Sequence, residues 1–339
     1  MAGGGGVTRY ARQVILPEVG ARGQARLAAA HVLVVGAGGL GVPALQYLAG
    51  AGVGRITLVD PDRVETGNLH RQPIYAAHLG QPKALAARDF VHALNPEVRL
   101  DPHVAWLDPA NAADHVVAAD VVLDCADGFA VSYTLSDQCR AAGKPLISAS
   151  ALGLGGYVGG FCGGAPSLRA VFPDLPETGA TCATAGVLGP VVGMLGAAQA
   201  QMALAVLLEL APSPLGQLVT LDARAFRFSG FRFDAAPEPS DPGHAFIARS
   251  AIRPGDFVVE LRDASEAPVP VAPGATRLTV EAFGPGGPRP ADGQRAVLAC
   301  RSGLRAWRAA DRLRPHFPGE IVLVADPAPE PVPEPGDHP

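Results

Sequence analysis

Up to residue 150 the chain alternates short apolar runs with longer segments of helical pattern. Apolar runs without polar interruption are typical of strands that are buried on both faces of a parallel sheet. The expected strands are residues 31–36, 55–60, 98–104, 120–125 and 145–150. Segments such as residues 39–51 have the pattern of the intervening helices. The alternation predicts an α/β fold of Rossmann-like type, with a mostly parallel sheet and helices on both faces.

After residue 151 the pattern changes, and residues 156–161 and 217–233 indicate antiparallel strands that extend the sheet. A proline-rich polar segment then separates a second, small α/β unit from the first. The last residues are rich in Pro and Glu, which is typical of a disordered tail. The expected parts are a first domain at 1–236, a linker at 237–245, a second domain at 246–326 and a tail at 327–339.

Residues 183–208 contain no charged side chain and are long enough to cross a membrane. Pro190 and several glycines and glutamines interrupt the segment, and no basic residues flank it. We interpret it as a buried core or interface helix and expect no membrane contact.

Composition narrows the class of protein. With 339 residues, 48% hydrophobic and 17% charged, the chain has room for two globular domains. A net charge of −5 without a basic stripe argues against nucleic-acid binding. Five scattered cysteines, with no apolar leader before the first strand, favour free thiols in the cytoplasm.

A glycine-rich turn follows the first expected strand. Its glycines are Gly36, Gly38, Gly39 and Gly41. Glycines let the backbone approach a phosphate, which the start of the next helix also favours. Asp60 ends the second strand, where a carboxylate binds ribose hydroxyls. Alone, this pattern is typical of an NAD-dependent oxidoreductase, which stays an alternative.

Further polar residues surround this turn in the sequence. They are Arg12 upstream, then Asp62, Asn68, Arg71, Gln72 and Lys83, and finally Asp127 after the fourth strand. Two cations and another carboxylate suit a triphosphate with a metal ion better than a nicotinamide.

These segments resemble the MoeB/ThiF/HesA group, the bacterial relatives of ubiquitin-activating enzymes. The resemblance covers about residues 7–233 and rests on motifs that occur in order: Arg-Tyr-x-Arg-Gln, Gly-x-Gly-Gly-Leu-Gly, Asn-Leu-x-Arg-Gln, Gly-Gln-Pro-Lys and Thr-Cys-x-x-Ala-Gly-Val. It implies a homodimeric enzyme that uses ATP to adenylate the C-terminal Gly-Gly carboxylate of a ubiquitin-like sulfur-carrier protein.

The resemblance also implies roles for single residues. Arg71 and Lys83 would stabilise the charge of the leaving pyrophosphate, and Asp127 would hold Mg²⁺. Asp60 would bind ribose, Asn68 and Gln72 would line the pocket, and Arg12 would reach the neighbouring subunit's site. Cys182 matches a mobile-loop cysteine that is implicated in a covalent adduct with the carrier, and a packing role is its alternative.

The chain departs from the family at three points. Ser167 and Ala170 stand where many members have the first of two cysteine pairs that bind zinc, and residues 183–299 contain no cysteine. Tetrahedral zinc needs four ligands, so we expect no structural zinc. Ser132 and Gly128 stand where the family often has Arg and Asn, which keeps a non-catalytic, carrier-binding adaptor as an alternative.

A second candidate for chemistry lies near the C-terminus. Residues 300–305, Cys-Arg-Ser-Gly-Leu-Arg, join an expected strand at 295–299 to an expected helix at 304–313. A thiol at the start of a helix, beside guanidinium groups, is a nucleophile. The loop resembles that of rhodanese domains, and Glu260-Leu261-Arg262 lies where they have an Asp-Val-Arg-like strand. Tyrosine phosphatases have one residue more in this loop, so its length favours sulfur.

Together the two resemblances imply that a persulfide on Cys300, charged by a donor such as a cysteine desulfurase, converts the adenylated carrier to a thiocarboxylate. Molybdopterin, thiamine, cysteine and thiolated-tRNA pathways all fit this chemistry. Dehydratases of the same superfamily that modify tRNA are another alternative, which the acidic balance disfavours.

Overall fold

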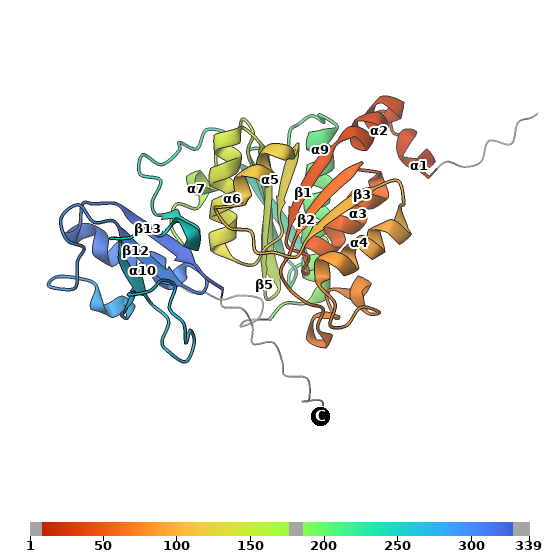
Figure 1. The fold of residues 1–339 in the computed structure, drawn as a ribbon. Coiled ribbons are helices and arrows are strands. Elements are labelled where there is room, and N and C mark those ends of the chain that lie inside the picture. Colours follow the sequence, from red (N-terminus) through yellow and green to blue (C-terminus); the bar gives the residue numbers. More distant parts are fainter. Residues whose placement is uncertain (1–8, 176–185, 328–339) are drawn as a thin grey trace, which may run out of the picture. The chain divides into compact units, whose positions relative to one another are not determined.

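The computed structural model describes residues 9–175 and 186–327. The chain divides into two compact units, Met1–Pro242 and Gly243–Pro339, which are described here one at a time (Figure 1).

The first unit is built on an eight-stranded sheet with the order β3-β2-β1-β4-β5-β6-β7-β8. The strands are β1 (His31–Val35), β2 (Arg55–Val59), β3 (Arg99–His103), β4 (Val121–Asp124), β5 (Pro145–Leu152), β6 (Gly155–Cys162), β7 (Gln217–Asp222) and β8 (Arg227–Arg232). Neighbours from β3 to β5 pair in parallel, and β5 to β8 pair antiparallel. The expected parallel sheet with an antiparallel extension is confirmed.

Helices cover both faces of this sheet (Figure 1). They are α1 (Ala11–Val14), α2 (Gly20–Ala29), α3 (Gly41–Ala51), α4 (Lys83–Leu94), α5 (Ala112–Ala118), α6 (Phe129–Ala142), α7 (Leu168–Val171) and α9 (Gly189–Leu207), with 3-10 turns at Thr66–Asn68 and Pro73–Tyr75. Val32 and Val34 of β1 pack in the core on the side of α3, α4 and α9. Leu33 and Val35 pack in the core on the side of α5 and α6. Burial on both faces explains why β1 is apolar from Val32 to Val35.

Helix α9 is long and apolar enough to cross a membrane by length and composition, and 39% of its most hydrophobic window is buried. It packs against α3, β4, β5 and β6. Its side chains Val191, Leu195 and Ala203 belong to the core of the first unit. The packing agrees with the interpretation of this segment as a core helix.

The strand order makes one position special. From β1 the chain continues to β2 and β3 on one side of the sheet, and later to β4 and β5 on the other. The loops after β1 and β4 therefore leave in opposite directions. In open α/β sheets such a switch point lies beneath a ligand-binding crevice at the carboxyl ends of the strands.

The second unit contains a five-stranded parallel sheet with the order β11-β10-β12-β13-β9. The strands are β9 (Ala245–Phe246), β10 (Phe257–Glu260), β11 (Thr276–Arg277), β12 (Ala296–Cys300) and β13 (Ile321–Ala325). Helix α10 (Leu304–Leu313) follows the central strand β12, and 3-10 turns lie at Arg249–Ala251, Val280–Ala282 and Arg314–His316. The helix expected at 304–313 is observed with the same bounds.

Candidate active site

The glycine turn joins β1 to α3 and lies at the switch point of the first sheet. Gly36 has a φ of +98°, and a Cβ there would lie 2.6 Å from the carbonyl oxygen of Cys125. A Cβ on Gly41 would lie 2.0 Å from the carbonyl oxygen of Gly36. Only glycine fits at either position, because the backbone has no room for a side chain. Tyr75 fixes the turn from below by donating a hydrogen bond to the carbonyl of Ala37, at 3.0 Å.

Asp60, just after β2, connects the second strand to this turn. Its carboxylate accepts hydrogen bonds from the N–H of Ala37 at 2.6 Å and of Asp62 at 2.9 Å. Burial raises the pKa of Asp60 to about 6, although the nearby charge of Lys83 acts in the opposite direction. Each carboxylate oxygen keeps a second lone pair, so Asp60 has capacity left for ribose hydroxyls.

The two cations expected at the phosphates lie beside the turn. Lys83 begins α4, its side chain is 6% exposed, and its Nζ lies 2.8 Å from a carboxylate oxygen of Asp62. Arg71 donates to Oδ1 of Asn68 at 2.7 Å. A Cβ on Gly39 would lie 3.3 Å from Cδ of Arg71, which places that side chain against the turn.

Gln72 completes this side of the crevice. It is 2% exposed, and its Nε2 is the nearest atom, at 3.7 Å, to a Cβ built on Gly38. Its Oε1 is buried without a hydrogen-bond partner among the described residues. An unpaired buried acceptor destabilises a protein by about 1–3 kcal/mol. This amide therefore points to a ligand that supplies a donor.

Two acids stand at the end of β4, and they differ in environment. Asp127 is exposed in the loop after the strand. Asp124 is buried and accepts hydrogen bonds from Ser148 at 2.8 Å and from the N–H of Ala126 at 3.3 Å. Burial raises the pKa of Asp124 to about 6, against hydrogen bonds from Ser132 and Ser148. Sequence reasoning missed Asp124, although an acid at the end of an apolar run was a usable signal.

Within the described ranges no three His, Cys, Asp or Glu side chains are grouped so as to hold a metal ion. Mg²⁺ typically takes one or two protein carboxylates and completes its shell with water and phosphate oxygens. The accessible carboxylate of Asp127 could supply the one protein ligand that such a Mg²⁺ ion needs.

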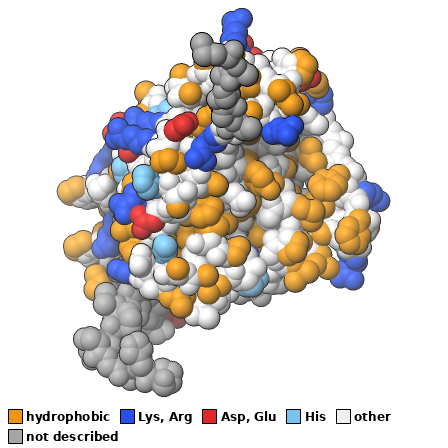
Figure 2. Space-filling model, turned by 90° about the vertical axis from the view of Figure 1, so that its right-hand side faces the viewer, with side chains coloured by type: hydrophobic (Ala, Val, Ile, Leu, Met, Phe, Trp, Pro, Cys, Tyr) orange, Lys and Arg blue, Asp and Glu red, His pale blue; other side chains and the backbone are white. Residues whose placement is uncertain are grey.

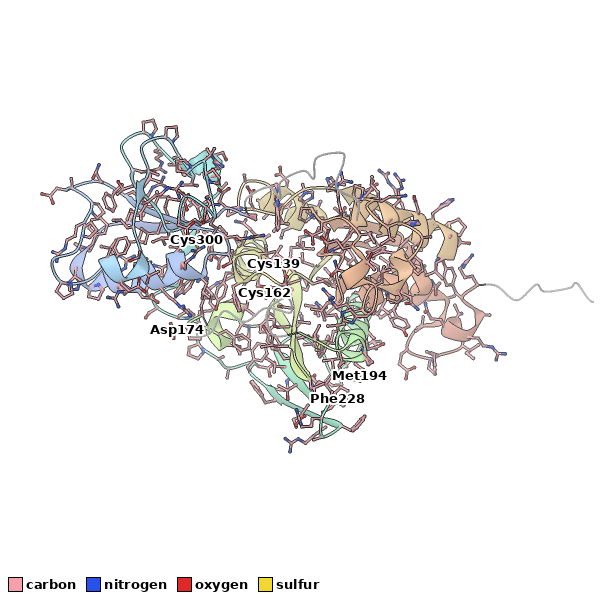
Figure 3. All side chains as sticks on the ribbon, turned by 90° about the horizontal axis from the view of Figure 1, so that it is seen from below. Cys139, Cys162, Asp174, Met194, Phe228 and Cys300 are labelled. Carbon is pink, nitrogen blue, oxygen red and sulfur yellow. The ribbon has the colours of Figure 1, made fainter. Side chains whose placement is uncertain are left out.

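Two expected residues lie apart from the groups described above. Arg12, which was expected to reach the neighbouring subunit's site, is exposed on α1. Cys182 lies outside the described residues. The four cysteines that the structure describes are buried, including Cys139 and Cys162, which pack in one core cluster (Figure 3).

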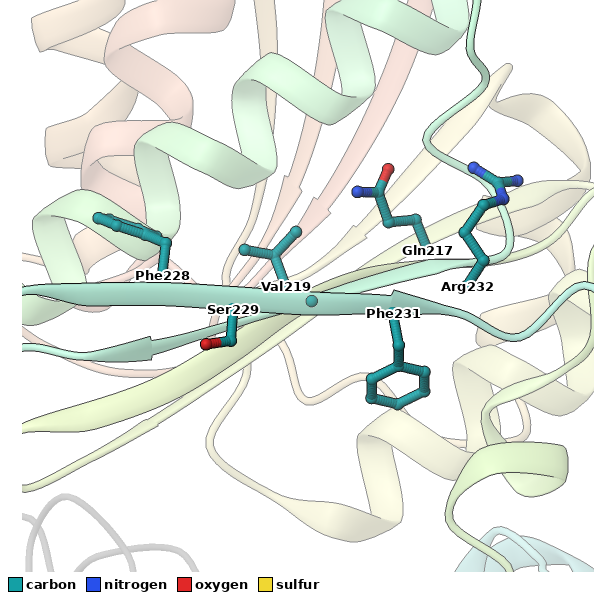
Figure 4. A pocket seen from close by; sticks show the side chains of 7 residues that line it. Gln217, Val219, Phe228, Ser229, Phe231 and Arg232 are labelled. Carbon is teal, nitrogen blue, oxygen red and sulfur yellow. The ribbon is translucent and has the colours of Figure 1, made fainter.

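A shallow hollow lies elsewhere in the first unit, over the edge strand β8 (Figure 4). Phe228 projects to one side of the strand with Gln217 and Val219, and Phe231 projects to the other. Arg232 is bound by Asp234 at 2.6 Å. Its cation is thus already paired, and the hollow lies over β8 rather than at the glycine turn, so it is not part of the candidate active site.

Ser167, at one of the two positions where the resemblance would place a cysteine, belongs to a polar network. The N–H and Oγ of Ser167 donate to Glu238 at 2.7 and 2.6 Å, and Arg140 also binds Glu238. Arg169 donates twice to Asp137, at 2.7 and 2.8 Å. Hydrogen bonds thus hold the segment that contains Glu238 at this place.

In the second unit Cys300 ends β12, and its side chain is fully buried (Figure 3). Its Sγ accepts hydrogen bonds from the N–H of Gly303 at 3.2 Å and of Ala306 at 3.4 Å. Arg305 lies nearby and donates to Glu266 at 2.5 Å. That hydrogen bond raises the pKa of Arg305, with a smaller contribution from Cys300. The sulfur sits in a cradle of donors at the start of α10.

A buried ion-pair network supports the same loop. Arg262 donates to both carboxylate oxygens of Glu260 at 2.8 Å and to Asp326 at 2.7 Å. The N–H of Asp326 donates to the carbonyl of Cys300 at 2.9 Å. Burial opposes ionisation of Glu260, but the hydrogen bonds from Arg262 lower its pKa. Sequence reasoning named Glu260 and Arg262 but missed Asp326 and Glu266.

The model of the ThiF family matches residues 10–243. The adenylyltransferase and sulfurtransferase MOCS3 of Bos taurus is 49% identical over 221 residues, which are 64% of this chain and 49% of that protein. The SAMP-activating enzyme E1 of Haloferax volcanii is 41% identical over 233 residues, 68% of this chain and 86% of that protein. The chain thus spans about half the length of MOCS3.

Among solved structures, that of MccB from E. coli with ATP has a TM-score of 0.60 and 21% sequence identity. The similarity covers 69% of this chain and 74% of MccB. At this identity it shows a common fold.

Proposed function

Because the chain belongs to the ThiF family, we propose that it uses ATP to adenylate the C-terminal Gly-Gly carboxylate of a ubiquitin-like sulfur-carrier protein. A persulfide on Cys300 then supplies sulfur to give a thiocarboxylate. Relatives named adenylyltransferase and sulfurtransferase, and one named as activating a carrier, support the two halves of this proposal. The observation that carries it is the pair of cations, Arg71 and Lys83, beside a turn whose backbone leaves no room for a Cβ at residues 36 and 41.

The adenylation step explains why these groups are needed. An oxygen of the carrier's carboxylate forms a bond to the α-phosphorus of ATP, and the bond from that phosphorus to the bridging oxygen breaks. Pyrophosphate leaves with growing negative charge, which Arg71 and Lys83 would stabilise. Asp60 would orient the ribose, and Asn68 and Gln72 would line the pocket. Mg²⁺ held by Asp127 would neutralise phosphate charge.

Preorganisation favours this assignment of Lys83. Its ammonium group is nearly buried and is already held by Asp62, which is itself about half exposed. A cation fixed in place before the reaction loses little freedom when charge develops beside it. In the alternative function, that of an NAD-dependent oxidoreductase, the buried ammonium group of Lys83 would have no role.

The sulfur step would use the second unit. The outer sulfur of the persulfide attacks the acyl carbon of the adenylate, and AMP leaves. A second thiol then attacks the Cys300 sulfur of the acyl disulfide, which releases the thiocarboxylate and forms a disulfide with Cys300. The N–H groups of Gly303 and Ala306 would stabilise negative charge on the sulfur of Cys300. We assign residues 246–326 as the rhodanese-like domain, 237–245 as the linker and 1–236 as the adenylation domain.

We further propose a cytoplasmic homodimer that receives sulfur from a cysteine desulfurase. Exposed apolar side chains on the first unit support a partner surface, among them Ile15 at 70% and Tyr47 at 52% exposure. Figure 2 shows hydrophobic side chains gathered over a broad part of one face. Apolar patches of this kind mark protein interfaces. Cys182 and Arg12 keep their proposed roles toward the carrier and the neighbouring subunit.

The test is mass spectrometry of candidate Gly-Gly carriers after incubation with ATP, Mg²⁺ and a sulfur source. Replacement of one carboxylate oxygen by sulfur is the expected result. Asp127→Ala should abolish carrier-dependent ATP–pyrophosphate exchange, whereas Cys300→Ala should keep the exchange and lose the thiocarboxylate. Unchanged sulfur transfer by Cys300→Ala would remove the persulfide from the proposal.

A non-catalytic adaptor is the second candidate, favoured by Ser132 and Gly128 at positions that differ from the family pattern. Ser132 donates a long hydrogen bond, 3.5 Å, to the carbonyl of Gly128, and its hydroxyl also lies beside Asp124. An adaptor would bind the carrier without any exchange. Wild-type protein that binds both ATP and a carrier but gives no exchange would favour it.

A further inference from the structure

Helix α9 carries one fully buried polar side chain, Gln199, within an otherwise apolar stretch. Its Nε2 donates to the carbonyl of Asp124 at 2.7 Å and to the carbonyl of Ile147 at 3.1 Å. Its Oε1 accepts from the Sγ of Cys125 at 3.4 Å. Both Nε2 hydrogens and the Oε1 of the amide are therefore engaged, and all partners lie on β4, β5 or the residue after β4.

These partners lie where the sheet meets the candidate active site. Asp124 is the last residue of β4, and the N–H of Cys125 bonds to Val35 of β1 at 2.8 Å. The carbonyl of Cys125 is the group against which Gly36 packs without room for a Cβ. Residue 125 is thus a common support for the glycine turn on one side and for the loop to Asp127 on the other.

We propose that Gln199 is a positioning residue for adenylation, which sets the place of Asp127 relative to the glycine turn by clamping the end of β4 to Ile147 of β5. The proposal rests on the proposed function. This role requires no contact of Gln199 with phosphate or metal. Gln199 acts through the backbone carbonyls of Asp124 and Ile147 and through the thiol of Cys125, the residue whose own backbone packs against Gly36.

A displacement of about 1 Å at a reacting group lowers a rate by about a hundredfold. A purely structural glutamine would instead affect folding stability and leave the response to Mg²⁺ unchanged. The two roles therefore separate in a measurement that compares Mg²⁺ dependence with thermal stability.

The experiment compares Gln199→Met with Gln201→Met. Methionine has a similar length to glutamine and cannot replace its hydrogen bonds. Gln201 is exposed on the same helix and serves as the matched control. The readouts are the rate of ATP–pyrophosphate exchange, the Mg²⁺ concentration for half-maximal exchange, the melting midpoint, and calorimetric binding of ATP with and without Mg²⁺.

For Gln199→Met we expect an exchange rate lower by about 10–100-fold and a higher Mg²⁺ requirement than in wild type. In calorimetry this variant should lose the gain in ATP affinity that Mg²⁺ gives, and the control should match wild type. Gln199→Glu keeps the size but loses the two donors, and it should show the same pattern if the methionine variant does not fold.

Folded Gln199 variants with an unchanged Mg²⁺ response would overturn the proposal, whatever their melting midpoint. Absence of exchange in the wild type, with Mg²⁺-dependent ATP binding still lost in Gln199→Met, would count against the proposed function and for the positioning role. The two failures are therefore distinguishable.

Discussion

The glycine turn after β1 and the cysteine loop after β12 are built alike, since each joins a central parallel strand to the start of a helix. They differ in what fills the space. In the cysteine loop the sulfur of Cys300 already accepts two backbone N–H bonds. Beside the glycine turn the buried Oε1 of Gln72 has no partner among the described residues. One loop carries its reactive group covalently, and the other is arranged to receive one from outside.

The buried acids of the two regions also differ, because their pKa values are shifted in opposite directions. Burial raises the pKa of Asp60 to about 6 near the glycine turn. In the second unit hydrogen bonds from Arg262 outweigh burial and lower the pKa of Glu260. A buried carboxylate whose loss of hydration is not offset by a partner is typical of a binding site. A carboxylate that is fully paired typically stabilises the fold.

The largest expected effect tests whether the network of the second unit is structural. Arg262→Ala leaves Glu260 buried without its partner, so we expect a loss of about 3–5 kcal/mol in the free energy of unfolding. Chemical denaturation of the full chain, followed by the fluorescence of Trp307 in this unit, measures it. Arg289→Ala, at an exposed position, is the control and should change stability by less than about 0.5 kcal/mol. A loss of similar size in both variants would contradict the difference drawn here.

The next effect concerns the nucleotide site alone. Lys83→Met removes a preorganised cation, and we expect exchange to fall by about 10²–10³-fold. The control is Arg88→Met on the exposed face of the same helix, where the guanidinium pairs with Asp89. Exchange by Lys83→Met within about tenfold of the control would show that this ammonium group does not stabilise the leaving group.

Dependence on pH should run in opposite directions in the two regions. The folded pKa of Asp60 lies above its ordinary value, so its contribution to stability is present at low pH and is lost as pH rises toward about 6. The folded pKa of Glu260 is lowered, so its contribution is present above about pH 4.5 and is lost as pH falls. Unfolding of wild type, Asp60→Asn and Glu260→Gln between about pH 3 and 7 should give differences from wild type with opposite slopes. Equal slopes would refute the contrast.

The smallest effect concerns the network at Glu238. Ser167→Ala removes one hydrogen bond to this carboxylate, for an expected loss of about 1 kcal/mol in unfolding free energy. Ser240→Ala, exposed in the same segment, is the control. Stability should not respond to a zinc chelator in either variant. A chelator that lowers the melting midpoint of the wild type would show that zinc contributes.

Much of the fold could be predicted from the sequence. The centres of strands such as β1 and β4 are apolar because both faces are buried, and that pattern is local. The glycines were also predictable, since the turn excludes any Cβ. Contacts such as Gln199 with Asp124, 75 residues apart, or Glu238 with Ser167, 71 apart, were not. They depend on how distant segments pack, and no local pattern of hydrophobic and polar residues predicts them.

Asp326 ties the end of the described chain to the centre of the second unit. Its backbone N–H holds the carbonyl of Cys300, and its carboxylate holds Arg262. Removing the chain from residue 326 onward would therefore release both the loop that carries the sulfur and a buried guanidinium at once.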